Sequence, residues 1–127
     1  MPERWLEGCR ILVVEDEYLL ADDLCSVLEE AGAQVLGPAP DVLRAETLIA
    51  AERTIDGALL DINLNGAKVF SVADTLLLQR VPLIFTTGYD QCALPERFAQ
   101  VPRMEKPIKE RQLRSVLGPL IAREDAS

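Results

Sequence analysis

Acidic residues directly follow two apolar runs that have the composition of buried strands. Arg10–Val14 is followed by Glu15 and Asp16, and Gly57–Leu60 is followed by Asp61. The carboxyl ends of parallel strands meet at one edge of an open α/β sheet, which is where such sheets bind ligands. Clustered carboxylate oxygens suit Mg²⁺, and a carboxylate can also act as a nucleophile. Taken alone, each segment has a plainer explanation, because acids also open turns and stabilise helix N-termini.

Two later segments end in residues that complement these acids. Pro82–Thr86 is followed by Thr87, and the weaker strand Val101–Glu105 is followed by Lys106. A lysine offsets part of the repulsion among three carboxylates, and a threonine hydroxyl can bond a phosphoryl oxygen. In phosphoryl transfer to a carboxylate, a metal and a lysine would bear the charge of the transferred group. We therefore expect one site that joins all four strand ends.

Apolar residues at helical spacing separate the expected strands. The expected strands are 10–14, 33–36, 57–61, 82–86 and 101–105, and the expected helices are 18–31, 42–51, 69–77 and 113–121. Gly37–Pro40 predicts a turn, Asp41 an N-cap, and Pro119 a kink or a loosened first half in the last helix. Residues 91–100 predict only a short or frayed fourth helix, and residues 122–127 a polar tail. The repeated alternation predicts a doubly wound α/β domain with a mostly parallel sheet.

Composition limits the possible functions. The 127 residues are sufficient for one domain, with its core at about residues 9–122, and we expect no output domain after the last helix. Three cysteines without metal-ligand spacing, no apolar run of membrane-spanning length and no secretory signal favour a cytoplasmic protein without a membrane anchor. The net charge of −8 opposes direct nucleic-acid binding. The chain has no histidine, so no phosphohistidine step can occur within it and any phosphoryl group must arrive on another residue.

Four motifs in order resemble the receiver domains of two-component response regulators, also called the CheY-like superfamily. They are ILVVEDE at the first strand, LLDINL at the third, PLIFTTGYD at the fourth and EKP at the fifth. The resemblance covers nearly the whole chain and implies a flavodoxin-like, five-stranded parallel sheet. It also implies a signalling protein, not an enzyme acting on an external substrate, that phosphorylates and dephosphorylates itself. Its phosphoryl donor would be a histidine kinase or a phosphotransfer protein, and its output would be protein–protein interaction.

The resemblance also implies roles for individual residues. Asp61 would be the phosphoacceptor, and Asp16 and Asp61 would bind Mg²⁺ directly. Glu15 would bind the metal mainly through water, and the backbone carbonyl of Asn63 would complete the protein ligands.

The resemblance places four side chains around the phosphoryl group. Thr87 and Lys106 would contact the phosphoryl group, whereas the side chains of Asn63 and Tyr89 would flank it and influence its lifetime.

Departures from the commonest receiver pattern qualify these expectations. Asn65 stands where most receivers have proline, which predicts a remodelled loop after the third strand. Arg103 replaces the usual switch aromatic, and we expect it to report activation by charge in the output segment 88–103. The stretch Phe85–Tyr89 resembles the Phe-Ala-Thr-Gly-Tyr motif of a divergent branch of single-domain receivers that is linked with stress-responsive histidine kinases.

Two other functions remain compatible with the sequence. A Mg²⁺-dependent phosphohydrolase could turn over phosphoesters through Asp61, although no second acid follows Asp61 at short spacing. A receiver-like interaction module that is never phosphorylated is the other alternative. Phosphorylation by a small donor separates both from a signalling switch.

Overall fold

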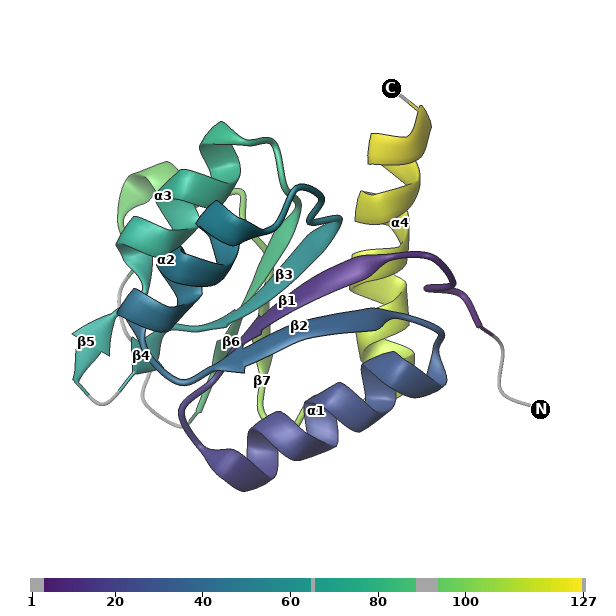
Figure 1. Ribbon diagram of the computed structural model, residues 1–127, viewed down its shortest axis with the longest axis horizontal. Helices are drawn as coiled ribbons and strands as arrows, with labels where there is room; N and C mark the ends of the chain where they lie inside the picture. The colour runs from purple at the N-terminus through teal and green to yellow at the C-terminus, as the bar shows by residue number, and fades with distance from the viewer. Residues whose placement is uncertain (1–3, 65, 89–93, 127) are drawn as a thin grey trace.

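A five-stranded parallel sheet forms the centre of the molecule, which we describe from a computed structural model (Figure 1). The structure describes residues 4–64, 66–88 and 94–126, with side chains as far as residue 122. The sheet contains β1 (Arg10–Val14), β2 (Gln34–Ala39), β3 (Gly57–Asp61), β6 (Leu83–Thr87) and β7 (Arg103–Glu105). Their spatial order is β2-β1-β3-β6-β7, and every neighbouring pair is parallel. The predicted doubly wound α/β fold is confirmed.

Four α-helices cover the two faces of the sheet (Figure 1). They are α1 (Tyr18–Glu30), α2 (Val42–Ala51), α3 (Phe70–Leu78) and α4 (Glu110–Ala126). One apolar core joins α2 and α3 to the sheet and includes the mutually contacting rings of Phe70, Phe85 and Phe98. The other core joins α1 and α4 to the opposite face and is mainly aliphatic. Because both faces are covered, β3 and β6 are buried along their whole lengths.

The N-terminal segment packs on the α1 and α4 side of the sheet. Leu6 is fully buried, and its N–H donates to the carbonyl of Ala31 at 2.8 Å. The Trp5 indole N–H donates to Glu110 of α4 at 3.1 Å. The sequence pattern predicted neither contact, because residues 4–9 have no helical or strand periodicity.

Two predicted boundaries were wrong. β2 continues through Gly37 and Pro38 to Ala39, where we had expected a turn. Its register with β1 shifts between Leu12 and Val14, and β2 lies at the sheet edge, where proline does not interrupt a second ladder. α4 extends to Ala126 with Pro119 inside it, so the residues expected to form a polar tail are helical through residue 126.

Several other local predictions are confirmed. Asp41 caps α2, since its carboxylate accepts a hydrogen bond from the Arg44 N–H at 2.8 Å. Gly32 follows α1 with a φ of +101°, a conformation that favours glycine at a helix C-terminus. In place of a full fourth helix, the described residues between β6 and β7 contain one 3₁₀ turn, η1 (Glu96–Phe98). Among the described residues, no helix is both long enough and apolar enough to cross a bilayer.

Candidate functional site

Lys106 joins two acids that come from distant parts of the sequence. Its ammonium donates to Glu15 Oε1 at 3.0 Å and to Asp61 Oδ2 at 3.1 Å. Glu15 follows β1, Asp61 ends β3 and Lys106 follows β7, so three strand ends meet here. The Glu15 and Asp61 side chains are almost completely buried, and the Lys106 side chain is 13% exposed. We call these three residues the site floor.

Backbone groups hold both acids of the site floor in place. The second Glu15 oxygen, Oε2, accepts a hydrogen bond from the Glu17 N–H at 3.1 Å. The second Asp61 oxygen, Oδ1, accepts one from the Asn63 N–H at 3.3 Å. Each carboxylate therefore has one oxygen on Lys106 and the other on a backbone N–H two residues further along the chain. Such side-chain to backbone bonds are typical of turns that follow a strand.

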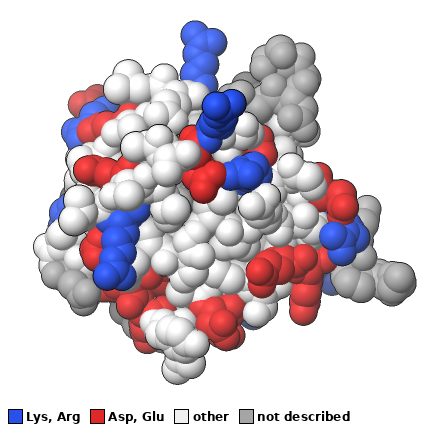
Figure 2. Space-filling model, viewed as in Figure 1, with Lys and Arg blue, Asp and Glu red and all other residues white. Residues whose placement is uncertain are grey.

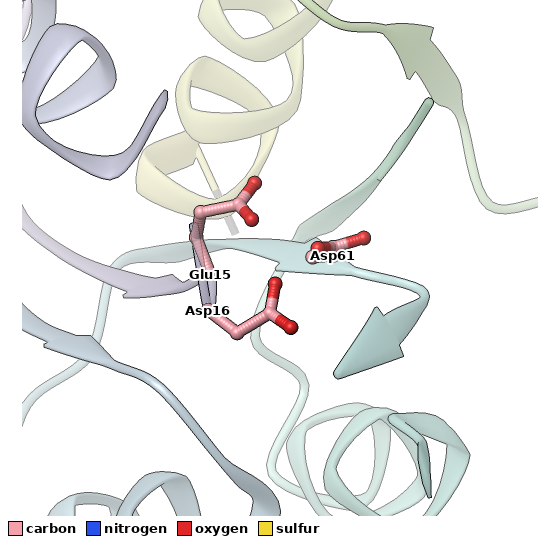
Figure 3. A group of neighbouring side chains, drawn as sticks. All are labelled: Glu15, Asp16 and Asp61. Atoms are coloured by element: carbon pink, nitrogen blue, oxygen red, sulfur yellow. The ribbon is translucent and has the colours of Figure 1, made fainter. Parts of the chain in front are cut away.

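Asp16 completes a group of three acids. Glu15, Asp16 and Asp61 each place a carboxylate oxygen within 4.8 Å of the others. Figure 3 shows Glu15 and Asp16 extending from the end of β1 toward the end of β3, where Asp61 lies. A cluster of this kind could hold a metal ion, and its all-oxygen donors fit a hard cation such as Mg²⁺. The sequence correctly predicted that these acids meet at one edge of the sheet.

Burial and contacts shift two pKa values in the site floor. Burial raises the pKa of Glu15 from its ordinary 4.5 to about 7, and the hydrogen bond with Asp61 acts in the same direction. The Glu17 N–H and Lys106 oppose this rise. Burial lowers the pKa of Lys106, but its contacts with Glu15 and Asp61 outweigh that effect and raise the pKa overall. Lys106 therefore stays charged at neutral pH, whereas Glu15 can exchange a proton there.

A hollow of about 200 Å³ opens above Asp61. Asp16, Asn63, Thr87 and Lys106 line it together with Asp61 and two further residues, Ile62 and Gly88. Thr87 is buried at the end of β6, and its carbonyl accepts a hydrogen bond from the Lys106 N–H at 2.8 Å. This bond fixes the end of β6 beside the end of β7. The hollow thus combines acids that could hold a metal ion with a threonine and an ammonium, which are the groups expected around a phosphoryl oxygen.

The remaining predicted residues have different positions. Asn63 lines the hollow, and the role of its backbone carbonyl as a metal ligand stays a prediction. Tyr89 lies outside the described residues. Arg103 is exposed on β7, where its backbone pairs with β6, and its side chain makes no ion pair with another described residue.

Sequence reasoning missed a small hairpin beside the hollow. β4 (Asn63–Leu64) and β5 (Ala67–Lys68) pair antiparallel, and the Lys68 ammonium donates to Asn63 Oδ1 at 2.6 Å. The Asn-Gly dipeptide at positions 65 and 66 is a strong two-residue hairpin signal, and it could have predicted the pairing of residues 63 and 68.

The chain is similar to proteins of known structure, although no family model matches it. SdrG from Sphingomonas melonis Fr1 is 32% identical, with a TM-score of 0.80 over 89% of this chain and 96% of that protein. The BeF3-activated conformation of SdrG from Pseudomonas melonis Fr1 is 30% identical, with a TM-score of 0.74 over 95% of this chain and 99% of that protein.

The chain is also similar to two further proteins that are regulators or receiver proteins. The phyllosphere-induced regulator PhyR of Methylorubrum extorquens is 36% identical over an alignment 118 positions long, which covers 85% of this chain and 42% of PhyR. A response regulator receiver protein from Sinorhizobium medicae WSM419 is 24% identical, with a TM-score of 0.75 over 92% of this chain and 97% of that protein. At this identity the last match concerns the fold alone. The chain spans less than half the length of the curated relatives it matches.

Proposed function

Because the chain belongs to the receiver domains of response regulators, we propose that it is a phosphorylation switch with Asp61 as the acceptor. The observation that carries this proposal is the double contact of Lys106 with Glu15 and Asp61, beside Asp16. This arrangement brings the proposed acceptor, the proposed metal ligands and a counter-charge together at one edge of the sheet. A carboxylate that merely opened a turn would not need a buried lysine and two neighbouring acids.

The proposed reaction transfers a phosphoryl group from a donor to the Asp61 carboxylate. An Asp61 oxygen attacks phosphorus, a P–O bond forms to Asp61, and the bond between phosphorus and the donor breaks. The donor leaves with the electron pair and takes a proton from solvent. The Lys106 ammonium lies 3.1 Å from Asp61 and would form an ion pair with a phosphoryl oxygen after transfer. The Thr87 hydroxyl would donate a hydrogen bond to another phosphoryl oxygen.

We propose that Mg²⁺ is the cation for the acidic cluster. Asp16 and Asp61 would bind it directly, Glu15 would bind it through water, and the Asn63 carbonyl would be a fourth protein group. Bound Mg²⁺ would neutralise part of the charge on the acceptor and the incoming phosphoryl group. The support from the structure is the three-carboxylate donor set within 4.8 Å.

The proposed donor is a histidine kinase or a phosphotransfer protein that carries phosphohistidine. The chain has no histidine of its own, and its charge of −8 is unfavourable for binding nucleic acid directly. In the view of Figure 2, acidic side chains gather over the lower part of the molecule, where α1 lies. Four acids of α1 are exposed: Asp22, Asp23, Glu29 and Glu30. We therefore propose a protein partner on both the input and the output side, in the cytoplasm.

The proposed output segment runs from Gly88 to Arg103, of which the structure describes residue 88 and residues 94–103. Phe98 anchors η1, since its ring is fully buried against Phe70 and Phe85. We propose that phosphorylation orders this segment, and that Phe98 anchors its described part. Tyr89 is proposed to slow loss of the phosphoryl group, and Arg103 to report activation through its exposed charge.

Intact mass after incubation with acetyl phosphate and Mg²⁺ tests the proposal. Wild type should gain one phosphoryl group, and Asp61→Asn should gain none. Asp74→Asn is the matched control, because Asp74 is an exposed acid that pairs with Arg97 on the surface, and it should behave as wild type.

The same experiment separates the alternatives. Continuous release of phosphate from varied phosphoesters without a stable adduct would favour the phosphohydrolase. A chain that takes no phosphoryl group from acetyl phosphate or from a phosphohistidine protein would favour the unphosphorylated interaction module. Modification of Asp61→Asn to the wild-type extent would remove Asp61 as the acceptor.

A further inference from the structure

The hairpin after β3 fixes one side chain of the hollow. Asn63 and Lys68 are direct partners in the β4–β5 pairing, and the Lys68 ammonium donates to Asn63 Oδ1 at 2.6 Å. Gly66, in the hairpin turn, has a φ of +89°, which a residue with a side chain rarely adopts. The short hairpin therefore places a cation on Asn63 through a charge-assisted hydrogen bond, which is stronger than a bond between neutral groups.

Asn63 also contacts the acceptor. Its N–H donates to Asp61 Oδ1 at 3.3 Å, and Asn63 lines the hollow together with Thr87 and Lys106. The Asn63 carboxamide has one acceptor atom, Oδ1, and one donor group, Nδ2. The hydrogen bond from Lys68 to Oδ1 fixes the orientation of the Asn63 carboxamide. Nδ2 is then the carboxamide group that can contact a ligand in the hollow. A donor suits a hollow that receives an anionic phosphoryl group.

We propose that Lys68 is a positioning residue that acts through Asn63 to prolong the life of the phosphoryl group. The inference rests on the proposed phosphorylation of Asp61. In the hydrolysis that ends the signal, water oxygen attacks phosphorus and the P–O bond to Asp61 breaks. The Asp61 carboxylate leaves with the electron pair, and a water proton passes to solvent.

Lys68 opposes this hydrolysis by occupying the Asn63 oxygen. A free carboxamide oxygen beside the hollow could accept a hydrogen bond from the attacking water and so orient it. An oxygen already bonded to an ammonium is a poorer acceptor for that proton. When Lys68 is removed, the amide regains an available oxygen and the freedom to rotate, and hydrolysis should accelerate.

Lifetimes of the phosphorylated protein test the role of Lys68. Protein phosphorylated with acetyl phosphate and Mg²⁺ is freed of donor, and loss of the phosphoryl group is followed by intact mass. Lys68→Met should shorten the half-life about fivefold, the change in rate that corresponds to the loss of one hydrogen bond of about 1 kcal/mol. Lys68→Arg, which keeps a charged donor, should restore most of the lifetime. Lys109→Met removes an exposed lysine that does not line the hollow, and it should leave the half-life unchanged.

A double mutant separates positioning from charge. In an Asn63→Ala background, Lys68→Met should have no further effect, because the amide that Lys68 orients is gone. An equal effect of Lys68→Met in both backgrounds would mean that Lys68 acts by charge alone, and would overturn the inference. An equal effect of Lys109→Met would overturn it as well.

The contact itself can be measured without phosphorylation. In NMR spectra of the unmodified protein, the Nδ2 proton resonances of Asn63 should shift in Lys68→Met and not in Lys109→Met. Unchanged resonances would overturn the inference whatever the lifetimes. A wild type that takes no phosphoryl group overturns the proposed function and this inference with it. A phosphorylated wild type with an unchanged Lys68→Met lifetime overturns this inference alone.

Discussion

The site floor and the surface around it are built differently. Glu15 and Asp61 are buried and Lys106 is largely covered, and each is held by contacts that cross between strands or reach into the following turn. The site margin, which we define as Asn63, Lys68 and Arg103, is half-buried or exposed. Substitutions in the floor should therefore change stability and phosphoryl acceptance together. Substitutions in the margin should change rates or partner binding and leave stability almost unaltered.

Lys106→Met should have the largest effect on stability. It leaves Glu15 and Asp61 buried without their cation, and breaking a buried pair typically costs about 3–5 kcal/mol. Urea unfolding at mildly alkaline pH measures the loss, since protonation of Glu15 offsets less of it there than at neutral or acidic pH. Lys109→Met is the control. A loss below about 1 kcal/mol, the size of an ordinary surface effect, would mean that the floor does not depend on Lys106.

The pH dependence of stability should be the second largest effect. Because the folded pKa of Glu15 is raised from 4.5 to about 7, the folded protein binds more protons in this range than the unfolded chain. The stabilisation that proton binding at Glu15 gives the folded state is complete below the unfolded pKa of 4.5. It is lost as pH rises through the folded pKa of about 7.

Comparison with a variant that cannot titrate at position 15 isolates this effect. Unfolding free energies of metal-free wild type and Glu15→Gln should diverge by about 3 kcal/mol across the range, at 1.4 kcal/mol for each pKa unit. Parallel pH profiles of the two proteins would contradict the assigned shift.

Mg²⁺ should stabilise the protein by a somewhat smaller amount. A cation that binds only the folded state adds about 2.7 kcal/mol at a concentration of one hundred times its Kd. Thermal unfolding with increasing Mg²⁺ measures this gain, and Asp61→Asn should reduce it because a predicted ligand is lost. A melting temperature indifferent to Mg²⁺ in wild type would exclude the cation from the three acids.

Arg103→Ala should have the smallest effect on stability. Arg103 is exposed and makes no ion pair with a described residue, so its removal should change the unfolding free energy by less than about 0.5 kcal/mol. Urea unfolding measures this change beside Lys106→Met under the same conditions. A larger loss would place Arg103 with the buried floor and not with the site margin.

The same contrast explains what could be predicted from the sequence. Asp61 and Lys106 were predictable because each follows a strand, and parallel strands bring their ends to one edge of the sheet. The bonds between them were not predictable, since residue types set which groups can meet but not the distances between their atoms. Burial in three dimensions, which no local pattern encodes, likewise determines the raised pKa of Glu15.

Short or irregular elements were harder to predict. β4 and β5 have two residues each, too few for alternation to be recognised, so the contact of Lys68 with Asn63 was missed. The extension of β2 past Gly37 depends on its place at the sheet edge, and the helical end of α4 overrides the expectation of a tail. In β2 and α4, tertiary context determined the structure more strongly than local propensity.

The position of Lys106 in the chain has a consequence for synthesis. Lys106 follows Asp61 by 45 residues and Glu15 by 91, so it leaves the ribosome long after both acids. A nascent chain that ends before β7 can already pair β1 with β3, yet this pairing brings two carboxylates together without their lysine. Translation therefore delivers the counter-charge last. We expect the central strands of an emerging chain to associate weakly until β7 is added beside β6, so that completion of the sheet and neutralisation of the site occur in one late step.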